Sequence, residues 1–562
     1  MIFVTNNIIS IKPLLRRTLV RFVLCSALIA SFIFSSEKIE AQKNDLSKVW
    51  VADNGDGTYK NPIIHADYSD PDVIRVGNDF YMVASSFDAV PGLPILHSKD
   101  LVNWTIIGHA LKKQIPFDHF SQTQHGNGVW APAIRYHNNQ FYIFYPDPDF
   151  GIYVITSQKI NGEWTEPKLV EAGKGLIDPC PLWDDDGKVY LVHAFAGSRA
   201  GIKNILVIKQ MNADATKTIN AGKLVYDAHG IETTVEGPKL YKRNNYYYIF
   251  APAGGVSTGY QIVLRSKNIY GPYERKIVLH QGSTNINGPH QGAWVTTQKN
   301  ENWFIHFQDK AAYGRIIHLQ PMTWKNDWPM IGVNIDKDGI GEPVAHYKKP
   351  DVGSIYEKIT PVESDEFNNP ELGLQWQWQA NPQQNWAYIY QGSLRMYAQK
   401  IADSAKNYWD VPNVLLQKFP TEEFRVTTKI KFHPNLENEK IGFIVMGTDY
   451  AYVSLIKKKD GIYIGYSVCK NADKGNAELE RIISKTESNE IYFSIEVKKN
   501  AICNFSYSTD NKNFISIGES FPAKSGKWIG AKFGFFCSRN IATNDAGYAD
   551  IDWCRVSALE NK

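Results

Sequence analysis

The sequence predicts an all-β chain in which a five-bladed β-propeller is followed by a β-sandwich. Short aromatic-rich strands separated by Gly, Asn, Asp and Pro turns fill the first two thirds, and one strand–turn–strand unit occurs there five times. The last third changes to strands in which apolar and polar residues alternate, as in half-buried antiparallel sheets. A chain of 562 residues is too long for one core, so two domains are expected.

The repeated unit has a proline near its start and an aromatic strand at its end, as in residues 69–84 (SDPDVIRVGNDFYMVA). The five prolines follow one another at intervals of 61, 47, 59 and 51 residues; they are Pro71, Pro132, Pro179, Pro238 and Pro289. Units of roughly 40–50 residues with four strands are typical of propeller blades, and the longer intervals need only extra loop residues. Five units therefore predict five blades.

Composition shifts divide the chain into segments. Residues 1–41 resemble a secretory signal, because basic residues precede a short apolar run (residues 22–34) that is too short for a membrane span with these flanks. A secreted or periplasmic location is therefore expected. The remaining segments are a lead-in (42–60), the propeller (61–349), a Pro- and Gly-marked linker (350–364) and the sandwich (365–562).

The overall composition narrows the class of partner. A net charge of +3 gives no reason to expect nucleic acid, and no stable membrane insertion is expected. The abundant aromatics (15 Trp, 30 Tyr, 27 Phe) suit both β-structure and stacking on sugar rings. Five cysteines follow the signal without metal-ligand spacing, so buried free thiols are favoured, although a disulfide in the C-terminal third is left open.

Three of the five units carry a carboxylate at the head: Asp70, Asp178 and Glu236. An acid next to proline usually caps a turn. Here the three acids share one register of a radial repeat, so propeller symmetry predicts that they converge near the axis. Mutual repulsion would raise the pKa of one carboxyl. Glycoside cleavage needs such a set, with one carboxyl protonated and another ionised.

Several segments resemble glycoside hydrolase family 43: the first unit, GVWAPAIRYHNNQFYIFY, GLIDPCPLWDDDGKVYLVHA and EGPKLYKRNNYYYIFAPAGG, within residues 60–330. LGLQWQWQANP, VMGTDYAYVSL and YADIDW resemble the concanavalin-like sandwich (jelly roll) of that family's β-xylosidase and α-L-arabinofuranosidase branch. The resemblance implies a propeller that hydrolyses pentosides with inversion. We expect an exo-acting enzyme that releases terminal β-D-xylose or α-L-arabinofuranose from xylan-type or pectic glycans.

The resemblance also assigns roles. Asp70 falls on the family's general base, Asp178 on the residue that orients the acid and tunes its pKa, and Glu236 on the general acid. Inversion requires base and acid carboxyls about 6.5–9.5 Å apart. Arg315 falls on an arginine that contacts sugar hydroxyls, and a surface ion pair is its alternative interpretation.

Phe87 and Trp130 are expected to contact the sugar, with blade packing as the alternative, and His290 is a further candidate for substrate binding. Where many relatives have aromatics after Phe87, this chain has small residues, which would open the pocket wall. No metal ligands are assigned and no cofactor is required. A structural calcium near His290 is compatible with the resemblance, but Ala293 stands where an acid is usual.

Other interpretations stay open at this stage. An endo-arabinanase would have an open groove, and a non-catalytic carbohydrate-binding propeller would have lost a carboxylate. The sandwich itself could bind glycan through a surface made of Trp376, Trp378, Trp386 and Trp409, or its loop 538–547 could close the pocket. In every case the expected partner is an oligo- or polysaccharide that contains xylose or arabinose.

Overall fold

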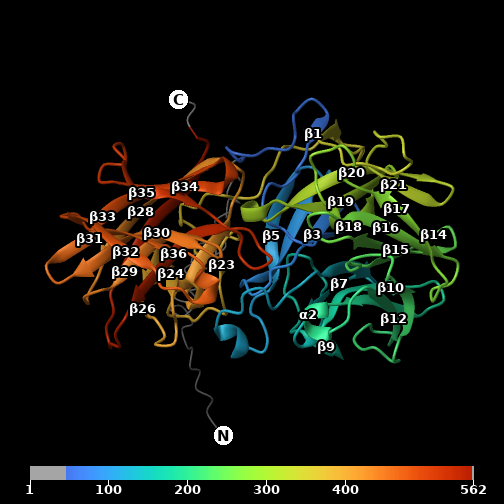
Figure 1. Ribbon diagram of the computed structural model, residues 1–562, viewed down its shortest axis with the longest axis horizontal. Coiled ribbons are helices and arrows are strands. Elements are labelled where there is room, and N and C mark those ends of the chain that lie inside the picture. Colours follow the sequence, from blue (N-terminus) through green and yellow to red (C-terminus); the bar gives the residue numbers. More distant parts are fainter. Residues whose placement is uncertain (1–45, 560–562) are drawn as a thin grey trace, which may run out of the picture. The chain divides into compact units, whose positions relative to one another are not determined.

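A computed structural model describes residues 46–559, whose regular secondary structure is almost entirely β-strand (Figure 1). Five consecutive four-stranded antiparallel sheets form the propeller, and two larger sheets form the sandwich. The predicted all-β fold is therefore confirmed. The signal predicted for residues 1–41 lies outside the described residues.

Each blade is a meander whose four strands follow one another in sequence. The blades are β2 (Asp72–Val76), β3 (Asp79–Val83), β4 (Gly92–Ser98), β5 (Trp104–Leu111); β6 (Ala133–His137), β7 (Gln140–Asp147), β8 (Gly151–Ser157), β9 (Lys168–Ala172); β10 (Leu176–Trp183), β11 (Val189–Phe195), β12 (Ile205–Met211), β13 (Lys223–Asp227); β14 (Lys239–Arg243), β15 (Tyr246–Ala253), β16 (Tyr260–Ser266), β17 (Glu274–Leu279); and β18 (His290–Thr296), β19 (Asn302–Asp309), β20 (Arg315–Lys325), β21 (Trp328–Ile331).

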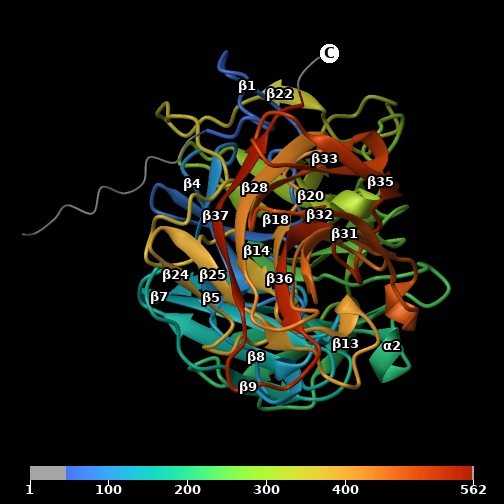
Figure 2. The ribbon, with the colours of Figure 1, turned by 90° about the vertical axis from the view of Figure 1, so that its left-hand side faces the viewer.

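The sandwich packs two sheets over one hydrophobic core. The first sheet is β23 (Gln377–Trp378), β27 (Val414–Lys418), β36 (Lys532–Arg539), β29 (Lys440–Met446), β30 (Tyr450–Lys458), β31 (Gly461–Cys469) and β32 (Leu479–Thr486), with β26 (Gln399–Lys400) beside β36. The second is β24 (Ala387–Tyr390), β25 (Ser393–Tyr397), β37 (Tyr548–Ser557), β28 (Phe424–His433), β33 (Glu490–Lys498), β34 (Ile502–Ser508) and β35 (Ile515–Pro522). In Figure 2, β37 and β28 lie side by side.

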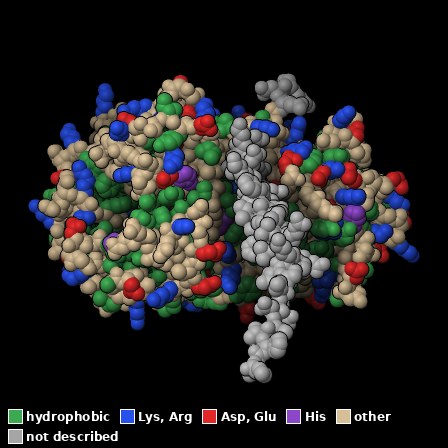
Figure 3. Space-filling model, turned by 180° about the vertical axis from the view of Figure 1, so that it is seen from behind, with side chains coloured by type: hydrophobic (Ala, Val, Ile, Leu, Met, Phe, Trp, Pro, Cys, Tyr) green, Lys and Arg blue, Asp and Glu red, His purple; other side chains and the backbone are tan. Residues whose placement is uncertain are grey.

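Helical segments among residues 46–559 are single turns: η1 (His119–Ser121), α2 (Gly197–Ala200), η2 (Ala311–Tyr313), η3 (Tyr408–Asp410), η4 (Ala472–Lys474) and η5 (Lys499–Ala501). Lysine and arginine side chains are interspersed with aspartate and glutamate over the face shown in Figure 3, as expected for a chain of small net charge.

Residues 61–70 close the ring of blades, because this segment runs along the last blade before the chain enters the first. Ile64 bridges Ile317 of β20, and the backbone N–H of Tyr68 donates to the carbonyl of Arg315 at 3.1 Å. Further out, β1 (Thr58–Lys60) pairs with β22 (His346–Lys348). This closure places residues 64–70 directly beside β20.

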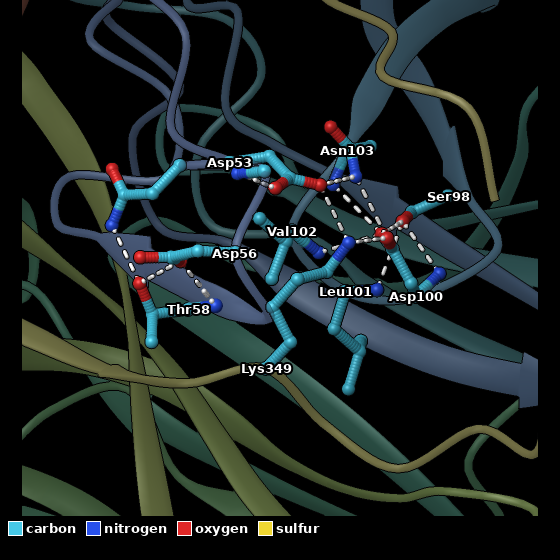
Figure 4. Close-up of polar contacts among 11 residues, drawn as sticks. Asp53, Asp56, Thr58, Ser98, Asp100, Leu101, Val102, Asn103 and Lys349 are labelled. Carbon is cyan, nitrogen blue, oxygen red and sulfur yellow. Dashed lines mark hydrogen bonds and ion pairs between the residues drawn. The ribbon is translucent and has the colours of Figure 1, made fainter. Parts of the chain in front are cut away.

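A buried polar network fastens both ends of the propeller to the first blade (Figure 4). The Lys349 ammonium lies 2.6 Å from Asp53 and 2.8 Å from Asp100, and the Asn103 amide donates to the same two carboxylates. Because Asp53, Asp100 and Asn103 are buried, they need partners inside the protein. The network therefore stabilises the closed ring.

The proposed glycan-binding surface of four sandwich tryptophans is wrong. Trp376, Trp378, Trp386 and Trp409 are only 1%, 8%, 4% and 8% exposed. Trp376 packs 5.7 Å from the ring of Phe535 inside the sandwich. The rings fill cores because large aromatic side chains bury more apolar area there than at a surface. The five described cysteines are free and buried, as favoured from the sequence.

Candidate active site

Asp70, Asp178 and Glu236 line one cavity of about 100 Å³, as the repeat predicted. Each stands just before or within the first strand of its blade, at the same end of the propeller. We call this the acidic cavity. The rest of its lining is Phe87, Trp130, Ala131, Ile177, Val256, Gln291, Arg315 and Trp528.

The repeated feature at the head of the blades is a backbone conformation. Asp70 and Asp178 both have φ of 56°, and Gly237 has φ of 58°. Aspartate tolerates this left-handed region better than most residues. A Cβ at residue 237 would come within 2.8 Å of the Gln291 side chain, so glycine occupies that position. The three acids were expected at the same position of their blades. Asp70 and Asp178 do occupy equivalent positions, but Glu236 lies one residue before that position, which Gly237 takes.

Asp70 is held by three side-chain donors. The hydroxyls of Ser69 and Ser85 donate to its Oδ2 at 2.7 and 2.6 Å, and Nη1 of Arg315 lies 3.2 Å from its Oδ1. A carboxylate accepts hydrogen bonds through both oxygens, so these donors fix the direction in which Asp70 points. Arg315 is therefore a partner of Asp70 inside the cavity and not a surface ion pair.

Asp178 is the carboxyl that favours its neutral form. Burial raises its pKa to about 8, and the neighbouring charge of Glu236 acts in the same direction. The backbone N–H of Gly237 donates to its Oδ2 at 2.7 Å and opposes that shift. The same hydrogen bond fixes the direction in which the carboxyl points.

The pKa of Glu236 is shifted in the opposite direction from that of Asp178. Burial raises its pKa, but a hydrogen bond and charge from His290 together with the charges of Arg315 and Lys203 outweigh this and leave the pKa below its ordinary value. His290 Nε2 lies 3.0 Å from Oε1 of Glu236, whose side chain is still 30% exposed. The neutral form is therefore favoured at Asp178 and the charged form at Glu236.

His290 does not occupy the place expected of a sugar ligand. It is 1% exposed, lies behind Glu236 and is absent from the lining of the acidic cavity. Gln291, with φ of 38°, lines the cavity instead. Among residues 46–559, no group of three or more His, Cys, Asp or Glu side chains could hold a metal ion.

One wall of the cavity is aromatic and includes a residue that we did not predict. The ring of Trp130 lies 6.4 Å from Phe87 and 6.2 Å from Trp528, edge to face in both pairs. Trp528 belongs to the sandwich loop between β35 and β36, and the guanidinium of Arg315 lies 5.9 Å from its ring. The prediction that loop 538–547 closes the pocket is wrong, because the sandwich reaches the cavity through the preceding loop.

Asp67 joins this sandwich loop to the propeller. Its Oδ1 accepts the backbone N–H of Arg315 and its Oδ2 accepts that of Gly530, both at 2.9 Å. A Cβ at Gly314 would come within 2.4 Å of the Asp67 carboxyl, so the three segments approach closely. One buried carboxylate therefore positions both Arg315 and the loop of Trp528.

Little in the sequence points to Trp528 or Asp67. Trp528 lies in the segment KSGKWIG, where the only signal is a large ring in a glycine-flanked turn. Asp67 precedes the repeated unit and has no counterpart in the other blades. Its role depends on the closure that sets residues 64–70 against β20.

Comparisons with known proteins agree with this architecture. Residues 59–329 match the family model "Glycosyl hydrolases family 43", and residues 364–557 match "Beta xylosidase C-terminal Concanavalin A-like domain". The chain is 35% identical over 549 residues to a beta-xylosidase of Formosa agariphila, which covers 89% of this chain and 90% of that protein. It is 28% identical over 537 residues to a non-reducing end alpha-L-arabinofuranosidase of Bacteroides ovatus, with 90% and 95% covered.

Among solved structures, a family 43 protein of Bacillus licheniformis has a TM-score of 0.77 and 25% identity, covering 89% of this chain and all of that one. A five-bladed propeller with carboxyls gathered in one cavity is the architecture of a glycoside hydrolase. The chain belongs to glycosyl hydrolase family 43 and carries that family's concanavalin-like C-terminal domain.

Proposed function

We propose that the protein is a secreted, exo-acting, inverting hydrolase that releases terminal β-D-xylose or α-L-arabinofuranose from xylan-type or pectic glycans. The observation that carries the proposal is the single cavity in which Asp70, Asp178 and Glu236 have three different environments. Relatives named as a beta-xylosidase and as an alpha-L-arabinofuranosidase support both sugars.

In this mechanism Asp70 is the general base. It takes a proton from a water molecule, whose oxygen then attacks the anomeric carbon from the face opposite the leaving group. The donors on Asp70 keep the carboxylate oriented before the water arrives. Arg315, beside both Asp70 and Trp528, is placed to bind a hydroxyl of the same sugar.

Glu236 is the general acid and protonates the glycosidic oxygen as the bond to the anomeric carbon breaks. Its side chain is 30% exposed. A sugar bound against this side chain raises the pKa of Glu236, because desolvation disfavours the charged form. In this proposal Asp178, held by the backbone N–H of Gly237, orients the acid and tunes its pKa.

The proposed exo action rests on the size and enclosure of the cavity. About 100 Å³ behind a wall that includes Trp528 suits a terminal sugar. An endo-arabinanase would need an open groove, which disfavours that second candidate. A non-catalytic propeller is disfavoured because all three carboxyls are present.

The test is a side-by-side measurement of turnover of 4-nitrophenyl β-D-xyloside and 4-nitrophenyl α-L-arabinofuranoside, with Asp70→Ala as the inactive control. Turnover of at least one substrate by the unchanged chain is expected, and turnover of neither refutes the proposal. The product profile from xylohexaose distinguishes exo from endo action, since only an exo enzyme releases xylose from the first time point. Secretion is checked by N-terminal sequencing of the mature protein, which is expected to begin at Gln42.

A further inference from the structure

A second, larger cavity of about 690 Å³ lies at the opposite end of the first strands of the blades. Asp70 precedes β2, whereas Arg75, which lines this second cavity, is near the end of the same strand. All five first strands contribute to its lining, and it shares no lining residue with the acidic cavity. We call it the basal cavity.

A buried ionic layer occupies the axis between the two cavities. Nη1 of Arg135 lies 2.6 Å from Oδ2 of Asp72, which is fully buried, and Nζ of Lys239 lies 3.9 Å from Oδ1 of Asp72. Lys239 also donates to the carbonyl of Pro132 at 2.8 Å. Because this layer is packed and paired, a ligand in the basal cavity would be held apart from the catalytic carboxyls.

The basal cavity presents flat aromatic rings that are held in place by their neighbours. Trp183 stacks on His137 with ring centroids 4.8 Å apart and planes at 15°, and Trp294 lies 5.3 Å from Tyr241, edge to face. Tyr136 is 40% exposed at this end of the propeller. Pre-positioned, partly exposed rings suit a ligand that has apolar faces of its own, such as a sugar ring.

The four cations that line the cavity, Arg75, Arg135, Lys242 and Arg243, are balanced by carboxylate or backbone carbonyl partners. Lys242 lies 3.1 Å from Asp185, and Arg243 lies 3.0 Å from Asp327. Arg75 donates to backbone carbonyls. A carboxylated or phosphorylated ligand would have to displace these partners. Exposed Asn244 and Asn245 add neutral amides that can bind hydroxyl groups.

We propose that the basal cavity is a second saccharide site, which binds a neutral oligosaccharide segment of the glycan that the acidic cavity trims. The inference rests on the proposed function for the identity of the glycan, and on the rings, volume and charge balance for the site itself. Holding a polymer at a second point keeps its other chain ends at a high local concentration near the catalytic cavity.

Isothermal titration of the full-length Glu236→Gln protein with xylohexaose tests the proposal without substrate being consumed. Two binding events are expected. Tyr136→Ala combined with Trp183→Ala is expected to weaken one event about tenfold, the effect of losing stacked rings, and Trp528→Ala to weaken only the other. Tyr388→Ala, which removes a ring of the sandwich that is 53% exposed, is the matched control and should change neither.

The proposal is overturned if only one binding event is seen and Tyr136→Ala combined with Trp183→Ala leaves it unchanged. It is also overturned if glucuronic acid binds more tightly than xylose at the second event. Tyr136→Ala alone removes a largely exposed ring, so it keeps the test decisive where the double variant melts at a lower temperature. Turnover of 4-nitrophenyl β-D-xyloside by the unchanged chain is measured in parallel. That rate reports on the proposed function and is independent of the basal cavity.

Discussion

The propeller and the sandwich contribute to the acidic cavity in different ways. The propeller supplies all three carboxyls and Arg315, each at a blade end, whereas the sandwich supplies one ring, Trp528, from a loop. Asp70 and Asp178 are buried, and all three carboxyls are held by hydrogen bonds, while Trp528 is 46% exposed. The difference indicates that the propeller carries the chemistry and that the sandwich shapes the pocket.

Removing a propeller carboxyl should have the largest effect. Asp70→Ala and Glu236→Ala are each expected to lower kcat at least about 10³-fold, because each deletes a proton-transfer group. Circular dichroism and thermal melting serve as controls for the fold. Activity within tenfold of the unchanged chain in either variant would contradict the assignment.

The roles of Asp70 and Glu236 can be distinguished by changing the leaving group of the substrate. A 4-nitrophenolate leaves without full protonation, so Glu236→Ala should lose less activity on the aryl glycoside than on xylobiose. Asp70→Ala should lose about equally on both, since activation of water is needed for either substrate. The same ratio of losses for the two variants would show that the acid and base roles are not divided in this way.

Asp178→Asn should lower kcat about 10²-fold and change the pH dependence of stability. The folded pKa of Asp178 is raised to about 8 from the model-compound value of 3.8, so its neutral form is favoured by folding. Its contribution to stability is present below about pH 4 and is lost as the pH rises towards 8. Thermal melting from pH 4 to 8 should therefore fall less for Asp178→Asn than for the unchanged chain, and parallel curves would contradict the shift.

Changing the sandwich ring should have a smaller and different effect. Trp528→Ala is expected to raise KM about tenfold with kcat within about threefold, because it removes a wall of the pocket but no proton-transfer group. Tyr388→Ala is the control for loss of an exposed sandwich ring. A loss confined to kcat would mean that the sandwich takes part in the chemical step.

Asp67→Asn tests the connection between the two domains and should have the smallest effect on catalysis. An asparagine accepts only one of the two backbone N–H groups, so KM is expected to rise a few-fold, with about 1–3 kcal/mol lost from the free energy of unfolding. Asp53→Asn is the matched control, since Asp53 is equally buried but belongs to the network around Lys349. Equal KM changes in both variants would reduce Asp67 to a merely structural residue.

The sequence was sufficient to predict the features of the fold and the site that repeat along the chain. Five proline-headed units predict five blades, and the heads of the first, third and fourth blades predict which acids meet. Radial symmetry turns a local pattern into a three-dimensional position, so distance along the chain does not matter. The one-residue offset of Glu236 arose because Gly237 takes the left-handed position that Asp70 takes in its own blade.

Features that occur once were not predictable in the same way. Trp528 and Asp67 act through contacts between segments more than 200 residues apart, and His290 lies behind Glu236 because of how the fifth blade packs. The sequence left the sandwich tryptophans open between a glycan-binding surface and the core, because composition cannot say which face of a strand a ring occupies. Only the packed structure contains that information.

The central claim is that Asp70 activates a water molecule while Glu236 protonates the leaving oxygen, with no covalent sugar–enzyme intermediate. Proton NMR of the first sugar released from 4-nitrophenyl β-D-xyloside, recorded before mutarotation, tests this most directly. The account predicts α-xylose as the first product, which then equilibrates. First appearance of β-xylose would mean retention through a nucleophilic carboxylate and would contradict the account.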